Sequence, residues 1–300
     1  MRYRALGRTG LEISAIALGT VSLGVDYGIA APGGFGRPGE AAAAALIAEA
    51  FDRGVTLFDT APAYGESERL IGRAIGDDPR AIVATKTGTA GIERSLDASR
   101  RALRRELLDI VQIHNATAAD IADGRAIDAL EEARRRGALR LIGASVYGEA
   151  AALAAIRSGR FDLVQVAFSV LDQRMAARVL PAAAASGVGV LIRSALLKGA
   201  LSAKAQWLPP ALDPLRQQAQ RARDELAGGD WNALPSAAVR FCLSACGVSA
   251  VLAGVRTEAE LAAALEAEAA GALTAGLASR AAALGLDDER LLNPSCWPVA

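Results

Sequence analysis

The chain has 300 residues, of which 52% are hydrophobic and only 4% are aromatic. Lysine and arginine total 33, aspartate and glutamate also total 33, and the formal net charge is zero. This balance argues against nucleic-acid and anionic-membrane partners, because proteins that bind either need a surplus of basic side chains.

Short apolar runs alternate with longer segments rich in Ala, Leu and Arg. Residues 2–5 and 12–14 predict a short hairpin, and the predicted strands cover residues 13–18, 55–59, 81–86, 109–114, 139–145, 163–167, 189–193 and 248–253. The predicted helices cover residues 40–53, 67–75, 92–107, 126–136, 149–158, 173–186, 235–245 and 258–268. Strands that alternate with helices pair in parallel through right-handed crossovers.

Eight such units in a chain of this length favour a closed (β/α)8 barrel, the TIM barrel, over an open sheet. We expect an α/β protein with a single domain over residues 1–300 and with the hairpin across the barrel bottom. Residues 24–39 and 201–230 predict long loops above the barrel, and the second contains a helix at 215–226. Barrels build their substrate pockets from such loops. The tail at 293–300 is predicted to fold over the pocket.

The three cysteines, Cys242, Cys246 and Cys296, are too few and too scattered for a secreted disulfide framework. Cys242 and Cys246 lie four apart, but a zinc site would need two more ligands and the only histidine is His114. No metal site is therefore predicted. The first residues carry no apolar signal segment, and no run of about 18 apolar residues follows. We therefore expect a cytoplasmic protein.

Three polar residues stand at the ends of consecutive predicted strands, namely Asp59, Lys86 and His114. Tyr64 follows in the loop TAPAYGES. Side chains at the carboxyl ends of barrel strands point into the catalytic mouth. Asp59 would keep Lys86 charged, and the ammonium would lower the pKa of Tyr64 and make it a better proton donor. None of these groups is a strong reductant, so a hydride would have to come from a bound cofactor.

Several segments resemble the aldo-keto reductases. The first of these are LGRTGLEISAIALGT, FDTAPAYGESERLIGRAI, ATKTG and DIVQIHNA, and LRLIGAS, LVQVAFSVLDQR, GVGVLIRSALLKGAL and VSAVLAGVRTEAEL follow in the family's order. The resemblance implies hydride transfer between NADP(H), with NAD(H) as the alternative, and a small-molecule carbonyl or alcohol substrate. It implies that Tyr64 is the general acid or base, that Lys86 and Asp59 tune it, and that His114 orients the substrate.

The resemblance also implies a set of cofactor-binding residues at the ends of the strands. Besides Asp59, these are Gly19 and Thr20 after the first strand, Ser145 and Gln165 at the carboxamide, Arg193 at the nicotinamide, Ser194, Leu196, Lys198 and Gly199 at the pyrophosphate, and Gly254, Arg256, Thr257 and Glu260 at the adenosine ribose and any 2′-phosphate.

The sequence departs from the family at the adenosine end and at the substrate site. Glu260 would repel a 2′-phosphate whereas Arg256 favours it, so the choice between NADPH and NADH stays open. Asn115 stands where many relatives have a tryptophan after the catalytic histidine. An aromatic wall would then come from elsewhere, the candidates being Tyr27, Phe35, Trp207, Trp231 and Trp297.

Two other functions suit the same barrel. A lysine at a strand end can form an imine in a Schiff-base lyase, but Lys86 would then have to lose the counter-ion that Asp59 provides. A cofactor-sensing regulatory subunit would bind the dinucleotide without turnover, and the complete set of four catalytic residues argues against it. Both a monomer and a homo-oligomer fit the sequence.

Overall fold

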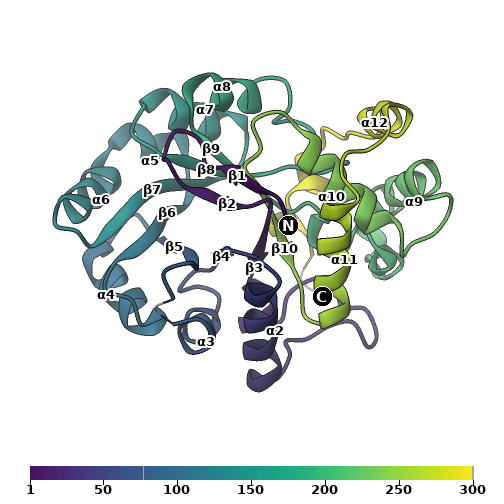
Figure 1. Ribbon diagram of the computed structural model, residues 1–300. Coiled ribbons are helices and arrows are strands. Elements are labelled where there is room, and N and C mark those ends of the chain that lie inside the picture. The colour runs from purple at the N-terminus through teal and green to yellow at the C-terminus, as the bar shows by residue number, and fades with distance from the viewer. Residues whose placement is uncertain (77, 299–300) are drawn as a thin grey trace.

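Eight parallel strands close into a barrel in the computed structural model, which describes residues 1–76 and 78–298 (Figure 1). Neighbouring strands pair in chain order, and the last strand pairs with the first. The strands are β3 (Ile16–Gly19), β4 (Leu57–Asp59), β5 (Ile82–Thr87), β6 (Leu108–Ala116), β7 (Leu139–Val146), β8 (Leu163–Ala167), β9 (Gly189–Arg193) and β10 (Ala250–Gly254). The predicted single-domain (β/α)8 barrel is confirmed.

Helices surround this barrel and bury the outward face of its strands (Figure 1). They are α2 (Glu40–Asp52), α3 (Ser67–Ala74), α4 (Ile92–Leu103), α6 (Arg125–Arg135), α7 (Glu149–Ser158), α8 (Val179–Ser186), α10 (Leu234–Ser244) and α11 (Glu258–Ala269). Within the described residues, no helix is both long enough and apolar enough to cross a bilayer.

Further helical elements lie in the connections and in the C-terminal segment. They are α1 (Val21–Gly24), α5 (Ala118–Asp123), α9 (Asp213–Ala227), α12 (Ala275–Ala282) and α13 (Glu289–Leu292), with 3-10 turns η1 (Leu197–Gly199), η2 (Ala203–Trp207), η3 (Pro210–Leu212) and η4 (Pro294–Cys296). The helix expected in the long connection after β9 is α9.

An antiparallel hairpin of β1 (Tyr3–Ala5) and β2 (Glu12–Ser14) covers one end of the barrel. Leu6 and Ile13 of this hairpin are fully buried and pack with the side chains that fill the barrel interior. Arg8 N donates a hydrogen bond to Gly187 O at 2.7 Å, directly before β9 begins. The hairpin therefore closes the amino-terminal end of the strands, as predicted, and leaves the carboxyl end for the site.

Three predicted elements differ from the structure by three or more residues at one end. The strand expected at 13–18 is divided at Ala15, because residues 12–14 pair with β1 and only Ile16–Gly19 joins the barrel. The helix expected at 92–107 ends at Leu103, because Arg104 takes a left-handed backbone with φ of 56°. The helix expected at 173–186 begins at Val179, because Gln173 and Arg174 are held in contacts with distant segments.

Candidate active site

A buried ion pair forms the floor of the site. Lys86 on β5 places Nζ 2.7 Å from Oδ2 of Asp59, the last residue of β4, and also donates to Thr60 O at 2.9 Å. The side chains of Lys86 and Asp59 are 0% and 4% exposed, respectively. Two oxygens therefore hold the ammonium in one position.

The second carboxylate oxygen of Asp59 is held from across the barrel. Gln165 Nε2 on β8 donates to Oδ1 at 2.7 Å, and Gln112 Nε2 on β6 donates to the same atom at 3.1 Å. Donors from three strands thus fix one carboxylate, and charge-assisted hydrogen bonds of this kind are the strong ones. Gln165, which the resemblance places at the cofactor carboxamide, also contacts Asp59 in this structure.

Tyr64 and His114 lie above this floor. Lys86 Nζ is 4.9 Å from the centroid of the Tyr64 ring, and the His114 ring meets that ring edge-on at 5.9 Å between centroids. The three strand-end residues and Tyr64 therefore converge at one rim of the barrel. This convergence follows from the parallel strand order, which brings the carboxyl ends of β4, β5 and β6 together.

The expectation that Lys86 lowers the pKa of Tyr64 is wrong for this structure. Burial raises the pKa of Tyr64, and the negative charge of Asp59 raises it further, while Arg193 opposes both. Burial also lowers the pKa of Lys86, and Asp59 opposes this shift. The ammonium is paired with a carboxylate at 2.7 Å, so the phenol is next to a nearly neutral pair and not next to a free cation. Tyr64 is accordingly a protonated phenol at neutral pH.

His114 is held as a neutral imidazole. Burial lowers its pKa from 6.5 to about 4, and the positive charge of Lys86 contributes to the shift. The backbone around it is irregular, because the register of β6 with β7 shifts between His114 and Ala116, and Asn115 takes a left-handed φ of 55°. Bulges of this kind re-aim side chains beside active sites. A neutral ring in such a position can donate or accept a hydrogen bond without adding charge.

Arg193 at the end of β9 reaches over the same rim. Its Nη2 donates to Val146 O at 3.1 Å, and its guanidinium carbon lies 3.8 Å from the centroid of the Tyr147 ring. Tyr147 was missed in the sequence, although it follows β7 directly. Gln112 was also missed, although it stands two residues before His114, and residues two apart share one face of a strand.

The connection after β9 has an unusual backbone. Ser194, Leu197 and Lys198 all have positive φ, at 61°, 44° and 58°. Side chains other than glycine rarely adopt this conformation, and strained residues of this kind gather at functional sites. This is the segment expected at the pyrophosphate, and its Leu197 and Gly199 N–H groups donate to Ser194 O and Leu196 O within the turn.

The remaining residues expected at the cofactor lie at the same carboxyl ends. Gly19 ends β3 and Gly254 ends β10, and Ser145 Oγ on β7 donates to Gln165 Oε1 at 3.4 Å. Thr20 is buried, and its hydroxyl donates to Asp59 O at 2.9 Å, so it supports the end of β4. Thr257 is the N-cap of α11, and the rim continues through Leu196 and Gly199 in and beside η1. The rim therefore carries hydroxyl and carboxamide groups beside the buried ion pair, and cations on the connections after β9 and β10.

Comparison with known proteins agrees with this geometry. The model of the Aldo/keto reductase family matches residues 15–282. The chain belongs to the aldo-keto reductase family. The family consists of oxidoreductases, and this member retains a tyrosine, a lysine, an aspartate and a histidine at one rim of its barrel.

Relatives of this aldo-keto reductase cover most of its length. L-galactose dehydrogenase of Arabidopsis thaliana is 28% identical over 289 residues, which is 87% of this chain and 86% of that protein. NADH-specific methylglyoxal reductase of Escherichia coli is 28% identical over 233 residues, which is 67% of this chain and 69% of that protein. A holo-form aldo-keto reductase structure from Bacillus halodurans superposes with a TM-score of 0.79 at 26% identity and covers 95% of this chain and 96% of that chain.

Proposed function

We propose that this aldo-keto reductase transfers a hydride between NAD(P)(H) and a small aldehyde, ketone or corresponding alcohol, with Tyr64 as the general acid in reduction and the base in oxidation. The observation that carries the proposal is the buried Asp59–Lys86 pair beneath the Tyr64 ring, with neutral His114 on its edge. The bound nicotinamide would supply the hydride to the carbonyl carbon.

The protein's own groups manage the proton and the developing charge. As the carbonyl oxygen becomes an alkoxide, it takes the proton of the Tyr64 hydroxyl, which is protonated at neutral pH and whose pKa burial raises further. The charge left on the phenolate faces the Lys86 ammonium, which lies 4.9 Å from the centroid of the Tyr64 ring and 2.7 Å from Asp59 Oδ2. His114 donates a hydrogen bond to the substrate oxygen and fixes its position without competing as an acid.

The geometry does not favour the Schiff-base alternative. An imine needs a free amine, whereas Lys86 Nζ donates to Asp59 and Thr60 and its side chain is 0% exposed. Borohydride treatment with an aldehyde should therefore leave the mass of the protein unchanged. A covalent adduct on Lys86 would reject the hydride-transfer assignment of this residue.

Tyr64→Phe tests the proposal because it removes only the proton donor. General acid catalysis typically contributes about 100-fold to 10,000-fold in rate, so kcat should fall by roughly this factor. The dissociation constant for the nicotinamide, measured by fluorescence quenching, should change little. Tyr3→Phe on the hairpin is the matched control, since Tyr3 donates to Gly54 O at the opposite end of the barrel. Wild-type turnover in Tyr64→Phe would remove Tyr64 from the mechanism.

A further inference from the structure

An ion cluster lies where the first, seventh and eighth connections of the barrel meet. Arg256, directly after β10, donates its backbone N–H to Glu260 Oε2 at 2.7 Å and places Nη2 3.6 Å from Glu260 Oε1. Lys204 on η2 places Nζ 3.4 Å from the same Oε1. Arg256 Nη1 also donates to Gly36 O in the loop after β3 at 3.0 Å. One carboxylate therefore pairs with two cations from different connections.

The cluster is partly withdrawn from solvent. The side chains of Arg256, Lys204 and Glu260 are 13%, 27% and 35% exposed. Opposite charges in such surroundings attract more strongly than on an open surface, because the effective dielectric is lower. Lys204 was absent from the residues that the sequence singled out, because only the fold brings it to Glu260, 56 positions away.

This arrangement discriminates between a hydroxyl and a phosphate on the adenosine ribose. A 2′-phosphate carries between one and two negative charges and would have to displace Glu260 from both cations, then remain beside its carboxylate. A 2′-hydroxyl can instead donate a hydrogen bond to that carboxylate, because an ionised carboxylate only accepts. Dinucleotide sites elsewhere use an acidic residue for the 2′-hydroxyl of NAD and an arginine for the 2′-phosphate of NADP.

We propose that Glu260, by occupying both Arg256 and Lys204, makes this aldo-keto reductase bind NADH more tightly than NADPH. The inference rests on the proposed function, because it needs the dinucleotide to lie along this rim with its adenosine ribose at Arg256. Arg256 is then a positioning residue for Glu260 and not a phosphate ligand in the wild-type protein.

Isothermal titration of the purified full chain with NADH and with NADPH tests this directly, without turnover. We expect the wild-type Kd for NADH to be lower by roughly tenfold or more, the ratio that one like-charge contact of about 1.4 kcal/mol produces. Glu260→Gln should strengthen NADPH binding by a similar factor and weaken NADH binding. Glutamine retains the N3 position of the cap on α11, so the helix start is preserved.

Two further variants separate this role from a general effect of charge. Glu258→Gln removes the same charge from an exposed position in the same helical turn, and it should leave both Kd values unchanged. Arg256→Ala in the Glu260→Gln background should remove the gain for NADPH. Tighter wild-type binding of NADPH, or an unchanged ratio in Glu260→Gln, overturns the inference and leaves the proposed function intact. Failure of every variant to bind either nucleotide rejects the proposed function as well.

Discussion

At the scale of single residues, Asp59 organises the candidate site. Its two carboxylate oxygens accept hydrogen bonds from Lys86, Gln112 and Gln165, and its carbonyl accepts two from Thr20, through the N–H and the hydroxyl. A buried charge is stable only when it is paired and hydrogen-bonded, and the surrounding strands meet both conditions. The same negative charge raises the pKa of Tyr64. One carboxylate thus sets the position of the lysine and contributes to the raised pKa of the phenol.

His114 provides a test at this scale, because it is the only histidine of the chain. Its imidazole signals in an NMR titration should move with a midpoint at about pH 4, since burial lowers its pKa from 6.5. The unfolded chain takes up this proton at higher pH, so the folded state should lose stability as the pH falls from about 6.5 to 4. This loss should be absent above pH 6.5 and complete below about pH 4. A midpoint near 6.5 would show that the ring is solvated and that its neutral role is wrong.

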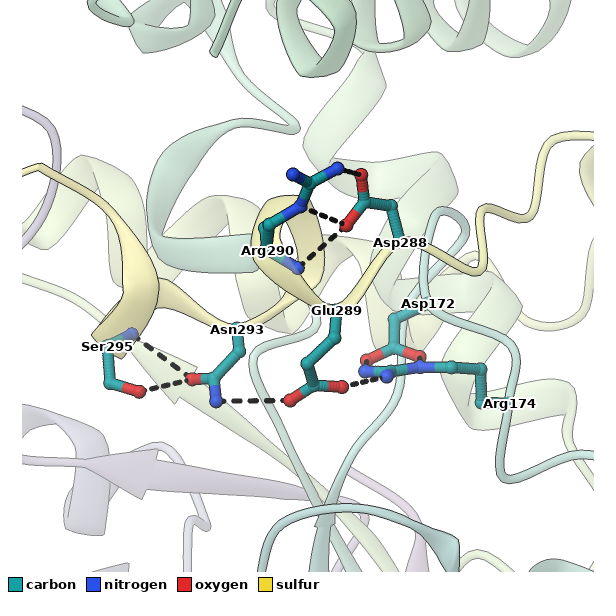
Figure 2. Close-up of polar contacts among 7 residues, drawn as sticks. All are labelled: Asp172, Arg174, Asp288, Glu289, Arg290, Asn293 and Ser295. Carbon is teal, nitrogen blue, oxygen red and sulfur yellow. Dashed lines mark hydrogen bonds and ion pairs between the residues drawn. The ribbon is translucent and has the colours of Figure 1, made fainter. Parts of the chain in front are cut away.

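At the scale of elements, Arg174 joins the connection after β8 to the C-terminal segment (Figure 2). It pairs with Asp172 through two bonds of 2.8 Å and also with Glu289 at the start of α13. Leu286 N donates to Leu171 O at 2.8 Å nearby. The tail then brings the Trp297 ring to 5.6 Å from Lys198 Nζ, beside the connection after β9. Of the tail predicted at 293–300, the described part therefore lies beside this connection, and residues 299–300 lie outside the described residues.

Arg174→Leu should lower the free energy of unfolding by about 3–5 kcal/mol, because it leaves a buried carboxylate without its partner. The side chain of Asp172 is 1% exposed, so its unpaired carboxylate would stay buried and the loss of unfolding free energy should be large. Glu289→Gln removes only the exposed arm of the network and should cost about 0–1 kcal/mol. Urea denaturation of the two variants measures the difference. Equal losses of unfolding free energy in the two variants would mean that the buried position of Asp172 does not strengthen its pair with Arg174.

At the scale of the whole molecule, the barrel is a packed cylinder that is closed at one end and functional at the other. Its interior is filled by aliphatic side chains from the strands together with Leu6 and Ile13 from the hairpin. Close packing requires small residues where the hairpin meets the strands. A Cβ on Gly7 would lie 2.4 Å from Gly187 O and 2.4 Å from Gly189 N. The hairpin therefore fits its place only if residue 7 has no side chain.

Gly7→Ala should destabilise the protein more than Gly10→Ala, by about 1–3 kcal/mol, the usual cost of overpacking. Both glycines have positive φ, at 55° and 76°, so both variants carry the backbone cost, but a Cβ on Gly10 meets no atom within 4 Å. Thermal or urea unfolding of the pair isolates the steric part. If the two variants unfold alike, the hairpin is not packed as tightly as the structure shows.

The elements that the sequence predicted well are those with strong local patterns. β8 and β9 were predicted to the residue at 163–167 and 189–193, because their apolar runs are bounded by turn residues. The helix expected at 173–186 lost its first part because Gln173 Nε2 donates to Val170 O and Ala281 O. A contact with a residue more than 100 positions away cannot be read from a local pattern.

The amino-acid sequence by itself determined the barrel and the grouping of Asp59, Lys86 and His114, because parallel strands in chain order must end at one rim. Only the tertiary structure decided the direction in which the pKa of Tyr64 shifts, since burial and the negative charge of Asp59 raise it. It also decided that Glu260 faces Lys204 as well as Arg256. Both outcomes depend on which distant groups share a desolvated space, and that is a property of the folded chain.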